Sequence, residues 1–183
     1  MKKLILFCLS MIILTPAFAQ EIAFRTDNDN VFSIGANYMI GKGNVAVGLS
    51  YMLDKISEER TFQIPMVTIS YELAFSFDKG AKALIRTFSG SIIELSQMKS
   101  CYDIGRDLKS AYSGSTSYYY YCYPYFEVSH NDLLIMMQEG IQKIRFETTI
   151  GMKDYSYEKD ELGGLLRKEY DLIFSKTKFD TDF

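Results

Sequence analysis

The sequence predicts an α+β protein: a mainly antiparallel twisted sheet with one short helix and a C-terminal amphipathic helix packed on it. Three observations support this prediction. Much of the chain alternates large apolar side chains with small or polar ones, a period of two that is typical of strands. Two later segments have the apolar spacing and the boundary residues of helices. Because strands come first and then alternate with these helices, the order of elements favours α+β.

The composition is that of one globular domain. The chain has 183 residues, of which 48% are hydrophobic and 23% are charged, so a disordered or low-complexity chain is excluded. Aromatic residues are abundant, with 14 Tyr and 13 Phe but no Trp. The only histidine is His130, which leaves little material for metal sites or for histidine-based acid–base chemistry.

Residues 1–19 have the pattern of a secretory signal peptide. Lys2 and Lys3 precede an apolar run over 4–14, and Ala17-Phe18-Ala19 is a small-x-small cleavage site before Gln20. The run is shorter than the about 20 residues that span a bilayer, and a retained N-terminal anchor is the alternative. We expect cleavage after Ala19, export to the periplasm or the cell exterior, and a mature single domain over 20–183 without a transmembrane segment.

The mature chain is mildly acidic. Loss of Lys2 and Lys3 with the signal peptide changes the formal net charge from −3 to −5, and no cluster of Lys and Arg remains to meet phosphates. Nucleic-acid binding is therefore not expected.

The N-terminal part of the mature chain predicts a lead-in and then a hairpin. Residues 20–30 are expected to be irregular, and Asp27-Asn28-Asp29-Asn30 to form a solvated turn. A calcium loop is the alternative, but the glycine and the distal glutamate of such a loop are absent. The alternating segments 32–40 and 45–53 predict two paired strands joined by a turn over 41–44.

The middle of the chain predicts three more strands and a loop. Large apolar residues alternate over 67–77, with Pro65 near the start of that strand, where a missing N–H is tolerated. Residues 82–88 and 91–98 form a second hairpin around Ser89-Gly90. Residues 99–117 are polar and rich in Ser and Gly, and we expect a long surface loop there.

The C-terminal third predicts strand, helix, strand and helix. After a strand over 118–128, Ser129 can cap a short helix that Gly140 ends, and a strand over 141–150 follows. The final helix is expected over 158–175. Within it, the pair Gly163-Gly164 leaves two alternatives open: the helix begins after the pair, or the glycines permit close packing.

Two cysteines remain after signal cleavage, and we expect them to form a Cys101–Cys122 disulfide. An even number of cysteines in an exported chain favours pairing, with two free thiols as the alternative. Metal ligation by both cysteines and His130 would lack a fourth ligand, so no metal and no cofactor are expected.

The run over 118–125 places tyrosines on both faces of a strand. If Phe126 and Val128 point inward, then Tyr118, Tyr120 and Cys122 point inward with them. The other face then carries a stripe of four tyrosines as the candidate ligand-binding residues: Tyr119, Tyr121, Tyr123 and Tyr125. Pro124 suggests an edge strand, where this stripe would be accessible. The alternative is that these rings pack under the final helix or the 31–53 hairpin.

Three segments carry a resemblance to a family. Residues 82–95 (KALIRTFSGSIIEL), 126–134 (FEVSHNDLL) and 139–147 (EGIQKIRFE) resemble uncharacterised small exported proteins of Bacteroidetes-type bacteria. Those proteins have a leader, a β-hairpin, a Gly-Ile-x-Lys-Ile-Arg strand and a C-terminal helix. The resemblance covers roughly residues 62–175 and implies export and a fold, but no activity.

No catalytic residue can be assigned from this sequence. Ser129 and His130 are adjacent, but catalytic partners come from distant segments, and no carboxylate pair stands out among the 23 acidic residues. The sequence therefore favours an exported, non-catalytic binding module for an unknown protein or glycan. The alternatives are a small envelope or polymer hydrolase that uses a carboxylate pair, and an inhibitor or accessory protein.

Overall fold

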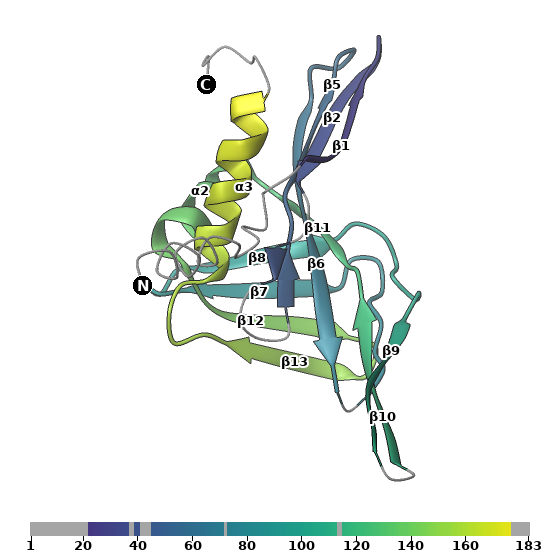
Figure 1. The fold of residues 1–183 in the computed structure, drawn as a ribbon. Helices are drawn as coiled ribbons and strands as arrows, with labels where there is room; N and C mark the ends of the chain where they lie inside the picture. The colour runs from purple at the N-terminus through teal and green to yellow at the C-terminus, as the bar shows by residue number, and fades with distance from the viewer. Residues whose placement is uncertain (1–21, 37–38, 41–44, 72, 113–114, 177–183) are drawn as a thin grey trace, which may run out of the picture.

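A computed structural model describes residues 22–36, 39–40, 45–71, 73–112 and 115–176, and it has a sheet-dominated α+β fold (Figure 1). The helices are α2 (His130–Glu139) and α3 (Leu162–Lys176). The strands are β1 (Ile22–Asp27), β2 (Val31–Ala36), β3 (Met39–Ile40), β4 (Val45–Val47), β5 (Ser50–Asp54), β6 (Arg60–Ser70), β7 (Lys82–Thr87), β8 (Ile92–Gln97), β9 (Gly105–Tyr112), β10 (Ser115–Cys122), β11 (Tyr125–Val128), β12 (Ile141–Thr148) and β13 (Gly151–Ser156). The strand pairings are antiparallel, which confirms the predicted sheet type.

Strand β6 is the centre of the sheet. Along the main path the strand order is β1-β2-β5-β6-β11-β8-β7-β12-β13, while β4 and β10 also pair with β6. The first half of β6 pairs with β5 and β11, and the second half pairs with β4 and β10. Figure 1 shows β1, β2 and β5 beside α3 at one end of the fold, and β9 and β10 at the other end.

The strand predicted over 67–77 is displaced in the structure. Strand β6 ends at Ser70, and among the described residues from 71 to 77 an isolated bridge joins Phe77 to Cys101. Pro65 lies in the middle of β6 instead of near its start. The missing N–H is tolerated because the partner strand changes there: pairing with β5 ends at Gln63, and pairing with β4 begins at Met66.

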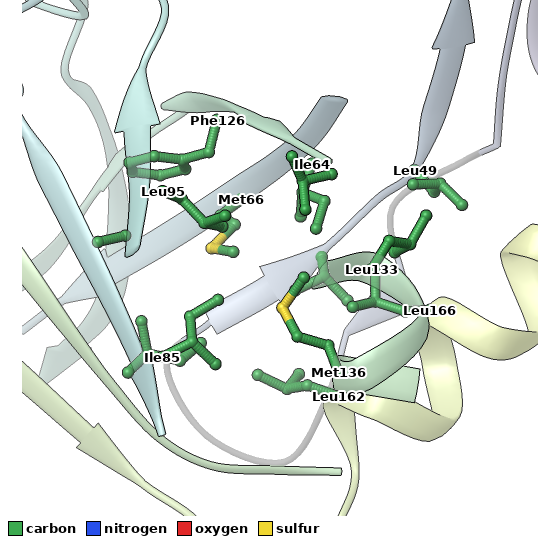
Figure 2. Packing of buried hydrophobic residues seen from close by; sticks show 14 of the residues in the cluster. Leu49, Ile64, Met66, Ile85, Leu95, Phe126, Leu133, Met136, Leu162 and Leu166 are labelled. Atoms are coloured by element: carbon green, nitrogen blue, oxygen red, sulfur yellow. The ribbon is translucent and has the colours of Figure 1, made fainter. Parts of the chain in front are cut away.

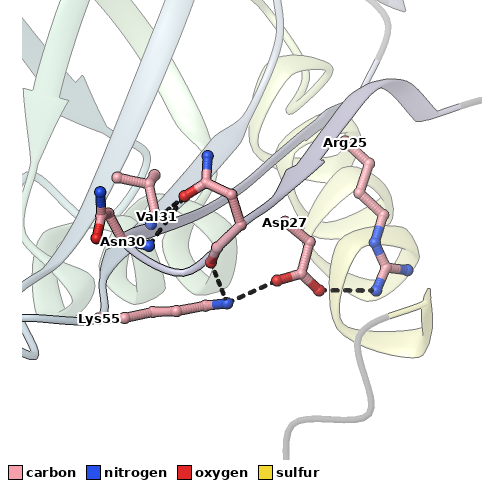
Figure 3. Close-up of polar contacts among 6 residues, drawn as sticks. Arg25, Asp27, Asn30, Val31 and Lys55 are labelled. Atoms are coloured by element: carbon pink, nitrogen blue, oxygen red, sulfur yellow. Dashed lines mark hydrogen bonds and ion pairs between the residues drawn. The ribbon is translucent and has the colours of Figure 1, made fainter.

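The expectation of an irregular lead-in over 20–30 was wrong for its described part, because β1 pairs with β2. The turn between them is the solvated turn that was expected (Figure 3). The side-chain oxygen of Asn28 accepts hydrogen bonds from the backbone N–H groups of Asn30 and Val31, at 3.0 and 2.8 Å. The ammonium of Lys55 lies 2.7 Å from the Asp27 carboxylate, and this hydrogen bond lowers the pKa of Asp27.

Both predicted hairpins are confirmed. Strand β2 pairs with β5 and β3 with β4, as expected for the 32–53 hairpin, although its turn over 41–44 lies outside the described residues. Strands β7 and β8 pair around the Ser89-Gly90 turn, with Ile85 opposite Ile93. Period-two alternation identified the strands of both hairpins, and the Ser89-Gly90 turn identified the connection in the second.

Besides β1, two strands were missed, and both of these have polar sequences. The predicted surface loop over 99–117 was wrong in its second half, because Gly105–Tyr112 forms β9 and pairs with β10. Strand β13 follows the turn at Gly151 and pairs with β12. Asp154 of β13 accepts two hydrogen bonds from Arg145, and these bonds lower its pKa. Neither strand has an apolar alternation that would mark it as a strand.

The helix boundaries follow from capping. Ser129 accepts a hydrogen bond from the Asp132 N–H at 3.0 Å, and Gly140 ends α2, both as predicted. Helix α3 begins at Leu162, later than the predicted residue 158. The carboxylate of Asp160 binds the N–H groups of Gly163 and Ile141, at 2.9 and 3.1 Å, which joins the start of α3 to the end of α2.

The hydrophobic core lies between the sheet and the two helices (Figure 2). Leu133 and Met136 of α2 and Leu162 and Leu166 of α3 are fully buried there, with Ile64 of β6. Next to this region lies an aromatic cluster formed by Tyr51, Phe62, Tyr170 and Phe174. Among the described residues, no helix is long and apolar enough to cross a membrane.

Candidate functional site

The tyrosine-rich run is divided between two strands. Strand β10 ends at Cys122 and β11 begins at Tyr125, and the carbonyl of Pro124 between them accepts a hydrogen bond from the Met66 N–H at 2.9 Å. The expected edge position was wrong, because β10 lies between β9 and β6, and β11 lies between β6 and β8. Pro124 is tolerated because it lies at the break between the two strands.

Four tyrosine rings contact one another along one face of the β9–β10–β6 segment, and we call them the tyrosine surface: Tyr71, Tyr119, Tyr121 and Tyr123. The ring centroids lie 6.2 Å apart for Tyr71 and Tyr119, 6.0 Å for Tyr119 and Tyr121, and 5.6 Å for Tyr121 and Tyr123. The two end members are the most accessible, because 47% of Tyr71 and 40% of Tyr123 is exposed. Figure 1 shows α3 at the other end of the fold from β10.

The strand register explains how these rings meet. Tyr121 pairs with Ile69 of β6 on one side and with Gly105 of β9 on the other. Tyr71 directly follows β6, whose last residue, Ser70, pairs with Tyr120, and this brings Tyr71 beside Tyr119. A Cβ atom at position 105 would lie 2.0 Å from the Tyr121 ring, so the ring rests directly on the glycine backbone. A larger residue at position 105 would displace this ring.

Three of the four predicted tyrosines therefore lie together, and the fourth has different surroundings. The ring of Tyr125 is half-buried on β11, with the ammonium of Lys99 at 5.2 Å from its centroid. Tyr71 was missed as a site residue. The signal that could have identified it is the shared alternation of Val67, Ile69 and Tyr71, which places Tyr71 on the same face of β6 as Ile69.

Asp107 is the charged partner of the tyrosine surface. It pairs with Tyr119 across β9 and β10, and the Tyr119 hydroxyl donates a hydrogen bond to its carboxylate at 3.3 Å. Partial desolvation raises the pKa of Tyr119, and the negative charge of Asp107 raises it further. Desolvation also raises the pKa of Tyr123, and the neighbouring Tyr121, Asp107 and Tyr125 raise it further.

The opposite face of β10 holds the two cysteines. Cys122 is buried and Cys101 is half-buried, and their sulfur atoms lie 2.8 Å apart as two thiols. The structure therefore does not contain the predicted disulfide, although it places the two cysteines in contact. Burial raises the pKa of Cys122, and the neighbouring Cys101 raises it further. On the same face, the guanidinium of Arg106 lies 4.4 Å from the Tyr118 ring centroid.

His130 has a structural position. Its ring stacks on Phe62 with centroids 5.1 Å apart, and its Nε2 lies 3.1 Å from the Tyr170 hydroxyl. The neighbouring Ser129 hydroxyl donates to Asp132 at 2.7 Å. The histidine therefore connects the start of α2 to β6 and α3, and Ser129 serves the helix cap.

A pocket of about 210 Å³ lies between the turn after Phe77 and the end of β12. It is lined by Asp78, Lys79, Gly80, Ala81, Glu147 and Thr148. Each of its carboxylates accepts a hydrogen bond from the protein: Asp78 from the Tyr102 hydroxyl, and Glu147 from the Lys82 N–H. Within the described part of the chain, no three side chains are grouped as metal ligands.

Comparison of the chain with protein-family models, with curated proteins and with solved structures finds no match.

Proposed function

We propose that this protein is an exported, non-catalytic binding module whose ligand docks on the tyrosine surface. One observation supports the proposal above all others. Four tyrosine rings are in continuous contact on one face of the sheet, and the two at its ends are 47% and 40% exposed. Tyrosine combines a large apolar ring with a hydroxyl and loses little conformational entropy on binding, so it is common in recognition surfaces.

The orientation of the rings favours a protein over a glycan as the ligand. Neighbouring rings are inclined by 61°, 42° and 81° along the series from Tyr71 to Tyr123. Sugar rings would stack best on coplanar platforms, whereas an irregular relief of ring faces, edges and hydroxyls matches the side chains of a protein. An inhibitor or accessory protein would bind its partner through the same surface. It would differ from a simple binding module only in its effect on the partner.

Replacement of the two exposed rings is expected to remove ligand capture. Tyr71→Ala/Tyr123→Ala should lose most of the binding of the natural ligand from an envelope extract, because exposed aromatic anchors carry much of the energy of an interface. The matched control is Phe88→Ala/Ile92→Ala, which removes two exposed apolar side chains from the β7–β8 hairpin. If the wild type and the Tyr71→Ala/Tyr123→Ala variant captured equal amounts of ligand, the ligand would not dock on the tyrosine surface.

Export and a disulfide belong to the same proposal, and the signal-peptide pattern of residues 1–19 supports the export. In an oxidising compartment, the two thiols at 2.8 Å are placed to form the Cys101–Cys122 disulfide. Such a disulfide closes the loop from Cys101 to Cys122 in the unfolded chain, and this would stabilise the fold by roughly 3 kcal/mol. We expect protein purified from the native host to begin at Gln20 and to be two hydrogen masses lighter than its reduced form. A mass that includes residues 1–19, or two alkylated thiols without reduction, would contradict the proposal.

A further inference from the structure

The carboxylate of Asp107 borders the tyrosine surface. The Asp107 carboxylate is exposed and lies beside Tyr119, within reach of its hydroxyl. Two described cations contact tyrosine rings outside this surface. Arg106 lies over Tyr118 on the opposite face, and Lys99 lies over Tyr125 on β11.

The rings add to this negative character. The face of a tyrosine ring carries partial negative charge, and a Lys or Arg side chain within about 6 Å of the ring centroid is attracted to it. The ring centroids lie 5.6–6.2 Å apart, so one bound side chain can contact two neighbouring rings together. A carboxylate at the border of the same surface offers an ion pair to the cation that the rings hold.

We infer that the tyrosine surface binds a basic segment of a partner protein, with a Lys or Arg side chain held between the tyrosine rings and Asp107. This inference rests on the proposed binding function and specifies its partner. The charge of the whole chain acts in the same direction, because the predicted mature protein has more acidic than basic residues. Such a charge excess accelerates the encounter with a basic partner and repels acidic partners.

The test measures the affinity of the mature chain for three labelled probes by fluorescence anisotropy. The probes are a Lys/Arg-rich peptide, a Glu-rich peptide of equal length, and a neutral oligosaccharide. The variants are Asp107→Asn, Tyr71→Ala/Tyr123→Ala, and Glu158→Gln, which neutralises an exposed carboxylate just before α3 as the matched control. Thermal unfolding of each variant shows that the fold is intact.

We expect the basic peptide alone to bind, and more weakly at high salt. Asp107→Asn should weaken this binding by roughly threefold to tenfold, and Glu158→Gln should leave it unchanged. Three results would contradict a basic partner. The acidic peptide could bind as tightly as the basic one, or the oligosaccharide alone could bind. The third is an Asp107→Asn variant with the same affinity for the basic peptide as the wild type. If Tyr71→Ala/Tyr123→Ala also kept full affinity for every probe that binds, the proposed function itself would fail.

Discussion

Glu169→Gln is expected to remove the loss of stability that ionisation of Glu169 causes in the wild type as the pH rises from about 5 to 9. Glu169 lies on the inner side of α3, is fully buried, and has no hydrogen-bond partner for either carboxylate oxygen among the described residues. Of the described elements that contact α3, strands β2 and β4 carry no titratable side chain, whereas helix α2 carries His130, Asp132 and Glu139. Burial raises the pKa of Glu169 to about 9, and the nearby Leu49 backbone opposes this only in part.

The sign of the effect follows from the two protonation states. In the unfolded chain this glutamate has its ordinary pKa of 4.5 and loses its proton above it, whereas in the folded protein it stays protonated up to about pH 9. The unfolded state therefore binds fewer protons in this range, and each pH unit destabilises the fold by up to about 1.4 kcal/mol. The stabilising contribution is complete below pH 4.5 and is lost as the pH rises to 9.

The measurement is the free energy of unfolding from urea titrations at pH 5, 7 and 9. Glutamine matches the shape of glutamate but does not ionise, so the variant should gain on the wild type as the pH rises. The control is Glu158→Gln, an exposed glutamate before α3, and its values should follow those of the wild type. Parallel curves for wild type and Glu169→Gln would show that this carboxyl does not keep its proton in the folded protein.

Gly163→Ala and Gly164→Ala are expected to change stability in opposite directions, although the two residues are adjacent. A Cβ atom at position 163 would lie 2.6 Å from the backbone carbonyl oxygen of Met136 and 2.9 Å from the Cα of Gly140. Because both are backbone atoms of the α2 end, the helices would have to separate, at a cost of about 2–3 kcal/mol. At position 164 the nearest atom to such a Cβ lies 4.0 Å away, so alanine fits there.

Gly164→Ala should therefore stabilise the protein by up to about 1 kcal/mol, through the higher helix propensity of alanine. The two midpoints of urea denaturation, measured side by side, give the comparison. Equal shifts in the same direction would mean that α3 does not approach α2 as closely as the structure shows. This pair also resolves the alternatives left open by the sequence, because the helix includes both glycines and Gly163 is the one that permits close packing.

The features that the sequence predicted well are those set by neighbouring residues. The Ser89-Gly90 hairpin, the Ser129 cap and the Gly140 end each depend on a few adjacent positions. Strand β9 was missed because its polar residues become a strand only by pairing with β10. The end of β6 at Ser70 was missed because it is set by which distant strands pair with β6.

The candidate site divides in the same way. Period-two alternation correctly grouped Tyr119, Tyr121 and Tyr123, whose rings contact one another in series. It could not show that β9 and β6 flank this strand, and these neighbours add Asp107, Gly105 and Tyr71 to the surface. The contact between Cys101 and Cys122 was anticipated from their number alone, and the distance between their sulfur atoms comes only from the fold.

Docking of a ligand on the tyrosine surface can be tested by site-specific photo-crosslinking in the native host. A photoreactive phenylalanine analogue is placed at Tyr71 or at Tyr123, and in the control proteins at Phe88 or at Ile92, all of them exposed positions. We expect a discrete adduct of higher mass from positions 71 and 123 and none from positions 88 and 92. Adducts only from the control positions, or equally from all four, would contradict it.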